Sequence, residues 1–180
     1  MSEKECSILI NEINKIVNDQ IDNFSIYQDG KRLALQFGND LYHGHNSHLT
    51  LDIIAKSEPL FRKCFLSVTD QAAELFNEHE DMHVSSFWIA KQFPGAVVPE
   101  HEDTDGGKNT HFEYSAVVYL NTLKDSGDLV FPSLNYSYSP KAGDLVIFPS
   151  KTTGTHVVKK INEDRYTLPM WLSKDKNFIL

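Results

Sequence analysis

Beyond residue 83 the chain is a succession of short apolar runs separated by Gly, Pro, Asn and Asp. Runs of this length and spacing are typical of strands in a β-sandwich or barrel. No helical pattern lies between them, which argues against a parallel, doubly wound sheet and for antiparallel strands. The expected strands cover residues 84–93, 111–120, 128–132, 144–148, 155–159 and 165–172.

The N-terminal part of the chain has helical patterns instead. Residues 3–18 carry apolar residues at helical spacing, and Ser2 with Glu5 forms a capping box at their start. A second helical repeat covers about residues 58–78. Between them, apolar residues flank Asp29-Gly30, a dipeptide that favours the tight turn of a β-hairpin over residues 24–37.

The length of the chain suits one folded unit. A chain of 180 residues with 41% apolar composition can bury a sizeable core without staples. We therefore expect a single domain over residues 1–180, mainly β with flanking helices (α+β). Its helical part would cover about 1–80 and its β core about 83–173.

Charge and cysteine content argue against several classes of partner and site. The 17 basic and 25 acidic residues give a net charge of −8, which disfavours binding to nucleic acid or to an anionic membrane. Cys6 and Cys64 are the only cysteines, too few for a disulfide framework or a Cys-rich zinc site. The chain starts without a signal-peptide pattern and has no long apolar stretch, so we expect a soluble, cytoplasmic protein.

The histidines are the first candidates for chemistry, and seven of the eight fall into three groups. His43, His45 and His48 lie in a polar, Gly-containing stretch without a nearby Cys or regular element. This composition is typical of a solvated loop, and the alternative is a lid over a site.

His79, Glu80 and His83 form the pattern H-E-x-x-H. On a helix this spacing places two imidazoles on one face for Zn²⁺, with the Glu as a base. However, the apolar helical repeat ends before this segment, and a strand is expected to begin near His83. The two histidines need not share a helical face, and a surface cluster at a helix end is the alternative.

The third group is His101-Glu102-Asp103 together with His156. On an extended segment residues i and i+2 point the same way, so His101 and Asp103 can bind one ion while Glu102 points elsewhere. Two imidazoles and one carboxylate leave three octahedral positions open, which suits Fe(II) in oxygenases. His-x-Asp alone is a weak signal. Glu102 and Asp105 are rival carboxylates, although Glu102 has the wrong parity and Asp105 lies towards Gly106-Gly107, where a turn is expected.

The sequence around this group resembles the Fe(II)- and 2-oxoglutarate-dependent dioxygenases of the prolyl 4-hydroxylase type. The similar blocks occur in the family's order over about residues 84–172. They are Phe93-Pro94-Gly95, His101-Glu102-Asp103, residues 116–121 (AVVYLN), residues 127–132 (GDLVFP), residues 140–150 (PKAGDLVIFPS), His156, residues 165–168 (RYTL) and Trp171.

The resemblance implies roles for five residues. His101, Asp103 and His156 would hold the iron as catalytic metal ligands, and Arg165 would pair with the far carboxylate of 2-oxoglutarate. A guanidinium suits this role because it stays charged when buried and presents a planar fork to a carboxylate. An exposed charge at a strand edge is the alternative for Arg165. Tyr119 matches a position that helps to hold the cosubstrate, although a sheet Tyr is often ordinary core.

The sequence departs from the family pattern at two positions. Phe93 lies where some members have a Tyr, so a hydroxyl contact with the cosubstrate would be missing. Pro169 lies where a small polar residue can face the cosubstrate. Because Pro cannot donate a ladder hydrogen bond, it also predicts a sheet edge or a bulge. Neither change affects the iron ligands.

The fold that the resemblance implies is a double-stranded β-helix, or jelly-roll, with the helices packed outside its larger sheet. The implied reaction is hydroxylation of a substrate C–H bond with release of succinate and CO₂. It would use Fe(II), 2-oxoglutarate as cosubstrate and O₂, with ascorbate as a further candidate cofactor. A prolyl residue of a peptide or protein is the favoured substrate, and a small molecule is the other option.

Two other functions remain open from the sequence. A zinc-dependent hydrolase would use His79, Glu80 and His83 and would consume no 2-oxoglutarate. A non-catalytic jelly-roll binding module would tolerate replacement of the His101, Asp103 and His156 set.

Overall fold

The computed structural model describes residues 1–19, 25–27, 32–38, 59–77, 82–104, 109–151, 154–175 and 177. Within these residues, helices α1 (Glu3–Asp19) and α3 (Pro59–Leu75) accompany ten strands and a short 3₁₀ helix, η3 (Pro132–Leu134). The strands are β1 (Ser25–Tyr27), β2 (Arg32–Gly38), β3 (His83–Gln92), β4 (Val98–His101), β5 (Tyr114–Tyr119), β6 (Leu129–Phe131), β7 (Tyr136–Tyr138), β8 (Leu145–Pro149), β9 (His156–Val158) and β10 (Arg165–Ser173). Among the helices described, none is both long and apolar enough to span a bilayer.

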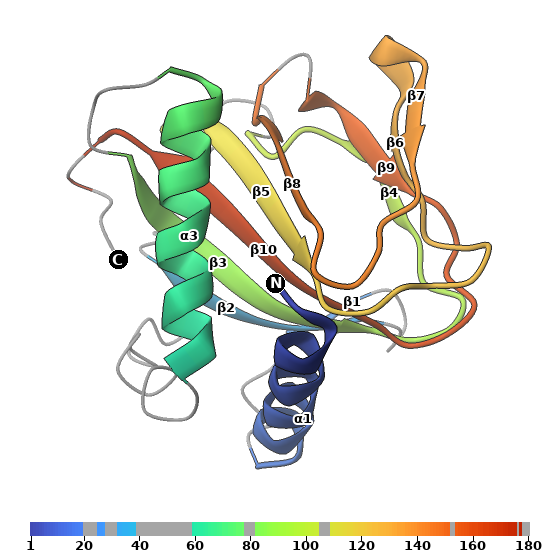
Figure 1. Ribbon diagram of the computed structural model, residues 1–180. Helices are drawn as coiled ribbons and strands as arrows, with labels where there is room; N and C mark the ends of the chain where they lie inside the picture. Colours follow the sequence, from blue (N-terminus) through green and yellow to red (C-terminus); the bar gives the residue numbers. More distant parts are fainter. Residues whose placement is uncertain are drawn as a thin grey trace.

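The strands form two antiparallel sheets (Figure 1). The large sheet has the order β1-β2-β3-β10-β5-β8, and the small sheet has the order β4-β9-β6-β7. Helices α1 and α3 lie on the outer face of the large sheet, and the small sheet faces its other side (Figure 1). The expected class, mainly β with flanking helices and a double-stranded β-helix core, is confirmed.

The two helices form because each has one apolar face that the large sheet buries. The Ser2–Glu5 capping box closes the first turn of α1, with the Ser2 amide donating to Glu5 Oε2 at 2.9 Å and the Glu5 amide donating to Ser2 Oγ at 3.3 Å. Leu9 and Ile13 of α1 and Phe61 of α3 are fully buried against the sheet. The two expected helices are therefore confirmed, each within a few residues.

Alternation along the central strands assigns their side chains to two environments. In β10 the even-numbered residues Tyr166, Leu168, Met170 and Leu172 belong to the core under the helices. The odd-numbered residues Arg165, Thr167, Pro169 and Trp171 line a cavity between the sheets. This follows from the two-residue period of a strand. One strand thus builds the core with one face and the candidate site with the other.

The structure differs from the expected strands at a few points. Strands β4 and β7 were not expected, because β4 contains Pro99 and exposed Glu100, and β7 is short and largely exposed. Pro169 does not lie at a sheet edge, since β10 pairs with both β3 and β5. Pairing with β3 is interrupted between Thr167 and Met170, where Pro169 has no amide hydrogen to donate to the ladder.

The hairpin of β1 and β2 is confirmed by the pairing of Tyr27 with Arg32. Its expected Asp29-Gly30 turn lies outside the described residues, as do the candidate lid residues His43, His45 and His48.

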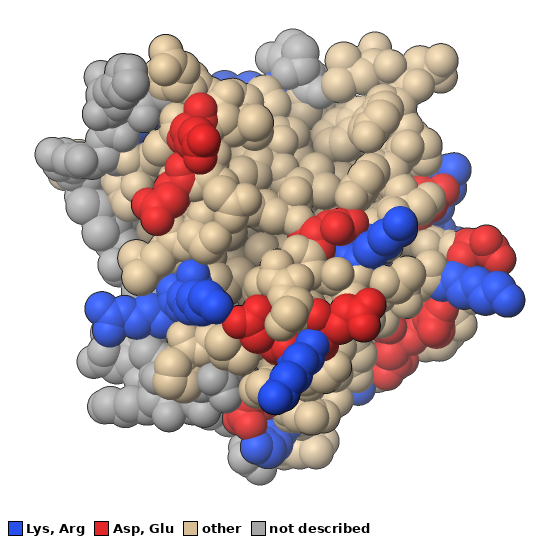
Figure 2. All heavy atoms as spheres, viewed as in Figure 1, with Lys and Arg blue, Asp and Glu red and all other residues tan. Residues whose placement is uncertain are grey.

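The face of the molecule in Figure 2 carries Lys and Arg interspersed with Asp and Glu, mostly over its lower half. A largely uncharged area occupies the upper centre of that face.

Candidate active site

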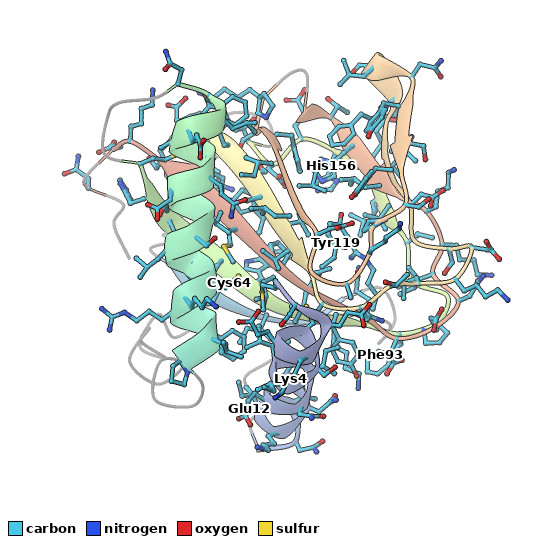
Figure 3. The ribbon with its side chains drawn as sticks, viewed as in Figure 1. Lys4, Glu12, Cys64, Phe93, Tyr119 and His156 are labelled. Atoms are coloured by element: carbon cyan, nitrogen blue, oxygen red, sulfur yellow. The ribbon has the colours of Figure 1, made fainter. Side chains whose placement is uncertain are left out.

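A cavity of about 450 Å³ lies between the two sheets. Strands β3, β5 and β10 of the large sheet and β4, β6 and β9 of the small sheet contribute to its lining. Figure 3 shows Tyr119 and His156 on the side of the large sheet that faces the small sheet, and Cys64 on α3, outside this space. The cavity therefore lies within the double-stranded β-helix and away from the helices.

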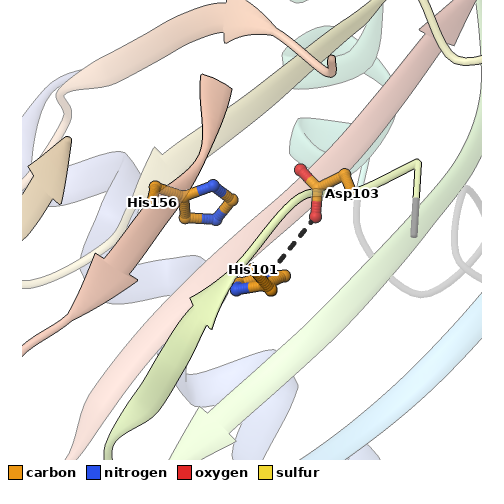
Figure 4. Close-up of side chains that lie close together, drawn as sticks. All are labelled: His101, Asp103 and His156. Carbon is orange, nitrogen blue, oxygen red and sulfur yellow. Dashed lines mark ion pairs between the residues drawn. The ribbon is translucent and has the colours of Figure 1, made fainter. Parts of the chain in front are cut away.

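His101, Asp103 and His156 come together in this cavity. His101 ends β4, His156 begins β9, and the antiparallel register pairs them, which brings the two ring centroids to 4.3 Å. Asp103 lies two residues beyond the end of β4, and its Oδ1 is 3.5 Å from His101 Nε2 (Figure 4). One ligand atom from each of the three residues lies within 4.8 Å of the others. The pairing of β4 with β9 therefore brings three metal-binding side chains around one point.

Backbone carbonyls fix how the two imidazoles face this point. His101 Nδ1 is 2.8 Å from the Pro99 carbonyl oxygen, and His156 Nδ1 is 2.8 Å from the Gly154 carbonyl oxygen. A carbonyl oxygen only accepts, so each Nδ1 carries the proton and each Nε2 keeps its lone pair. Metal-binding histidines are oriented in this way by a hydrogen bond at the other ring nitrogen.

The protonation states also suit a divalent metal. Burial raises the pKa of Asp103, but His101, His156 and the hydrogen bond from Ser115 lower it more, so the pKa lies below its ordinary value. Burial lowers the pKa of His156 despite the nearby carboxylate. At neutral pH the cluster therefore offers an ionised carboxylate and a neutral imidazole, the forms that bind metals.

Arg165 places a buried positive charge in the same cavity. Its side chain is 5% exposed, its Nη1 donates to Gln92 Oε1, and its guanidinium lies 5.1 Å from the centroid of the Tyr119 ring. Among the described residues it has no carboxylate partner. A buried charge without a counter-ion is costly, so this environment favours an anionic ligand.

Two buried hydroxyls line the same cavity as this charge. Tyr119 Oη and Thr167 Oγ1 have no hydrogen-bond partner among the described residues. Burial raises the pKa of Tyr119, which keeps its hydroxyl a donor. Unpaired buried donors are rare unless a ligand or water uses them. Together with Arg165 they provide the donors that a carboxylate needs.

Other residues singled out from the sequence lie outside the cluster of His101, Asp103 and His156. Phe93 packs against the core under the helices, where Lys91 Nζ lies 5.2 Å from its ring centroid, so its missing hydroxyl does not concern the cavity. Lys91 also pairs with Asp164, at 3.4 Å. Glu102 lines the cavity but accepts a hydrogen bond from Thr155 Oγ1 at 3.1 Å. Asp105 lies outside the described residues.

The H-E-x-x-H pattern does not form a single helical face within the described structure. Helix α3 ends at Leu75, and His83 is the first residue of β3. His79 and Glu80 lie outside the described residues. Among the residues described, the only group with metal-binding geometry is His101, Asp103 and His156.

Sequence reasoning missed several polar residues of the cavity region. Thr167 lies two residues after Arg165 on the same strand, so the strand period could have identified it. Gln92, Ser115 and Ser150 carry no such signal, because tertiary pairing alone brings them to Arg165 and Asp103.

Comparison with known proteins identifies relatives of the whole arrangement. A candidate prolyl 4-hydroxylase of Acanthamoeba polyphaga mimivirus is 27% identical over 106 residues, which cover 53% of this chain. The match spans only 41% of the viral protein's length.

Solved structures share the fold at low sequence identity. A Pseudomonas putida prolyl-4-hydroxylase matches with a TM-score of 0.59 and 21% identity, over 97% of this chain and 89% of that one. A Trichoplax adhaerens prolyl hydroxylase, in complex with a hypoxia inducible factor oxygen degradation domain peptide fragment, matches with a TM-score of 0.62 and 15% identity, over 96% and 80%. The viral collagen prolyl hydroxylase of Paramecium Bursaria Chlorella virus-1, in complex with 2OG, gives 0.56 and 19%, over 98% and 92%.

A family model assigns the chain more directly. The model described as the 2OG-Fe(II) oxygenase superfamily matches residues 76–173, more than half of the chain. That range contains the whole cluster of His101, Asp103 and His156 and the buried Arg165. The chain belongs to the 2OG-Fe(II) oxygenase superfamily.

Proposed function

We propose that the protein is an Fe(II)- and 2-oxoglutarate-dependent oxygenase that hydroxylates a prolyl residue in a peptide or protein. The observation that carries the proposal is one cavity that holds both an oriented His-Asp-His cluster and a buried guanidinium with no carboxylate partner among the described residues. Metal binding needs the first, and a dicarboxylate cosubstrate needs the second. Family membership supports the combination.

The side chains divide the work. His101 and His156 would hold the metal through Nε2, and Asp103 would hold it through Oδ1. Arg165 would bind the far carboxylate of 2-oxoglutarate, and Tyr119 and Thr167 would donate hydrogen bonds to it. When bound, the iron and cosubstrate supply O₂ activation and the decarboxylation to succinate. The protein orients the reactants and excludes water.

The lining favours a peptide prolyl residue over a free amino acid. Arg165 is the only cation among the described lining residues, and the cosubstrate would occupy it. A free amino acid would bring a second carboxylate without a partner, whereas a prolyl residue within a chain is neutral. Phe112 stacks on Trp171 at 5.6 Å between ring centroids, forming an aromatic wall. Aromatic walls of this kind bind the pyrrolidine ring in proline recognition. The names of the relatives point to the same substrate class.

The test is a turnover screen with Fe(II), 2-oxoglutarate and O₂. Peptides containing proline, the same peptides with alanine in its place, and free proline are compared by succinate release and by a gain of one oxygen in the product's mass. We expect coupled turnover only with the proline peptides. Asp103→Ala should abolish both signals, whereas Asp70→Ala, an exposed change on α3, should leave them unchanged.

Two outcomes would contradict the proposal. Metal-loaded protein that oxidises none of these substrates and releases no succinate is not an oxygenase of this kind. One tightly bound Zn²⁺ that is lost in His79→Ala but kept in His101→Ala would favour the zinc hydrolase instead.

A further inference from the structure

Two serine hydroxyls form a hydrogen-bonded series that ends at the Asp103 carboxylate. Ser115 Oγ donates to Asp103 Oδ2 at 2.5 Å, and Ser115 Oγ lies 2.8 Å from Ser150 Oγ. Ser115 is 2% exposed and Ser150 is fully buried. The three side chains come from the turn after β4, from β5 and from the end of β8. Such a buried polar group persists only if its members satisfy one another.

The chemistry of the groups fixes the direction of this chain. An ionised carboxylate only accepts, so the single hydroxyl proton of Ser115 is used on Asp103. Ser115 must then accept from Ser150, which donates its own proton. The backbone holds Ser150 in place, because its amide donates to the Glu113 carbonyl at 3.0 Å. The order of donation is therefore Ser150 to Ser115 to Asp103.

We propose that Ser115 and Ser150 are positioning residues of the metal site, which restrict Asp103 to binding the metal through one oxygen. The inference rests on the proposed function. Ser115 engages Oδ2, whereas Oδ1 is the oxygen that lies 3.5 Å from His101 Nε2. A carboxylate free to rotate can bind a metal through both oxygens.

The number of open positions makes this restriction matter. Three single-atom protein ligands leave three positions of an octahedral ion open. A cosubstrate that chelates the metal needs two of them, and O₂ needs one. A two-oxygen Asp103 would take a fourth position and leave no place for O₂ beside the cosubstrate. By keeping Asp103 to one bound oxygen, the two serine hydroxyls would leave a metal coordination position open for O₂.

Titration with Mn(II), followed by calorimetry, tests the proposal without turnover. Ser115→Ala should weaken Mn(II) binding about 10- to 100-fold, the usual effect of losing a partner of a metal ligand. Ser115→Thr keeps the hydroxyl on a strand residue and should restore most of the affinity. The matched control is Ser85→Ala, which removes a buried hydroxyl donating to the Trp171 carbonyl at 3.1 Å, outside the cavity lining. It should bind Mn(II) like the parent.

The order of donation is tested by a double-mutant cycle and by spectroscopy. Ser150→Ala should weaken Mn(II) binding less than Ser115→Ala does, and it should add nothing when Ser115 is already Ala. In the Co(II)-substituted protein with 2-oxoglutarate bound, Ser115→Ala should change the visible absorption that reports coordination number. Ser115→Thr should give the parent spectrum.

The possible failures are distinguishable. If folded Ser115→Ala binds Mn(II) as tightly as Ser85→Ala and keeps the parent Co(II) spectrum, the positioning role is wrong while the metal site stands. If Ser115→Ala and Ser150→Ala weaken Mn(II) binding additively, the proposed hydrogen-bond order from Ser150 through Ser115 to Asp103 is wrong. If the parent binds no Mn(II), the proposed function fails together with this inference.

Discussion

At the scale of single residues, the buried charge of Arg165 has a high desolvation cost. Its guanidinium is 5% exposed and meets the neutral side chains of Gln92 and Tyr119. Removing such a charge from water costs several kcal/mol, and neutral partners offset this cost only in part. A carboxylate that binds next to the guanidinium offsets this desolvation cost by forming an ion pair with it. The residue is therefore a sensitive probe of cosubstrate binding.

Replacing Arg165 should change 2-oxoglutarate affinity without changing metal affinity. Arg165→Ala leaves the far carboxylate without its partner, a loss of about 3 to 5 kcal/mol, or on the order of a hundredfold or more. Arg165→Lys keeps the charge but not the planar fork, so its affinity for 2-oxoglutarate should lie between those of the parent and Arg165→Ala. Calorimetric titration of 2-oxoglutarate into the Mn(II)-loaded proteins measures this order.

The control for the Arg165 series is Lys159→Ala. Lys159 pairs with Asp128 at 3.2 Å, away from the cavity lining, so its removal should leave cosubstrate affinity unchanged. Unchanged affinity in folded Arg165→Ala would show that another group holds the carboxylate.

The sequence predicts the principal polar residues of the site but not their supports. The grouping of His101, Asp103 and His156 and the matching position of Arg165 follow from spacing and family resemblance. The hydroxyls of Ser115 and Ser150 do not, because only the pairing of β5 with β8 brings them to Asp103. Long-range pairing of this kind leaves no local pattern in a single sequence.

At the scale of elements, the start of α1 is held by contacts that depend on charge. Hydrogen bonds from Lys63 of α3 and from Ser2 lower the pKa of Glu5 from 4.5 to about 2. Lys63 Nζ lies 2.8 Å from Glu5 Oε1. Because the pKa is lower in the folded state, this carboxylate stabilises the fold above its ordinary pKa, and the contribution is lost as the pH falls towards 2.

Glu5→Gln should therefore destabilise the protein at neutral pH, and the difference from the parent should shrink between about pH 4.5 and pH 2. Urea unfolding followed by circular dichroism across this range measures it. Glu3→Gln is the control, because it removes a charge from the same first turn without a contact to Lys63. A difference that stays constant with pH would show that the charge of Glu5 is not involved.

Elements were predictable where burial shapes the sequence. The helices and the longer strands β3, β5 and β10 carry apolar residues at a regular period, and the expected ranges match them closely. Strand β4 was missed because residues 99 and 100 are exposed and its register is set by pairing with β9. Yet β4 carries His101, so part of the site depends on an element with little local signal.

At the scale of the whole molecule, the large sheet has a core on each face. The larger core lies under α1 and α3, and a smaller one lies between the sheets around Leu129, Phe131 and Val158. Because both cores share β5 and β8, we propose that residues 1–180 unfold as one domain. The helix-side core should then govern stability without touching the metal ligands.

Leu9→Ala tests this separation, since Leu9 is fully buried under the sheet. The lost side chain and the cavity it leaves should lower the free energy of unfolding by about 2 to 5 kcal/mol. The control Leu66→Ala makes the same chemical change at a side chain that is 58% exposed, and it should cost less than about 0.5 kcal/mol. Both variants should keep the parent affinity for Mn(II) and unfold in one transition. Two separate transitions would show that the helical part folds independently.

The alternation along β10 has a consequence for how this sequence can diverge. Because Arg165 and Thr167 line the cavity while Tyr166 and Leu168 belong to the core under the helices, deleting one residue within the strand would exchange the two faces on one side of the deletion. If the deletion followed Thr167 and the rest of the strand kept its register, Arg165 and Thr167 would face the apolar core and Tyr166 would face the cavity. Over evolutionary time the strand can accept substitutions one position at a time, whereas changes in length should be confined to the turns on either side of it.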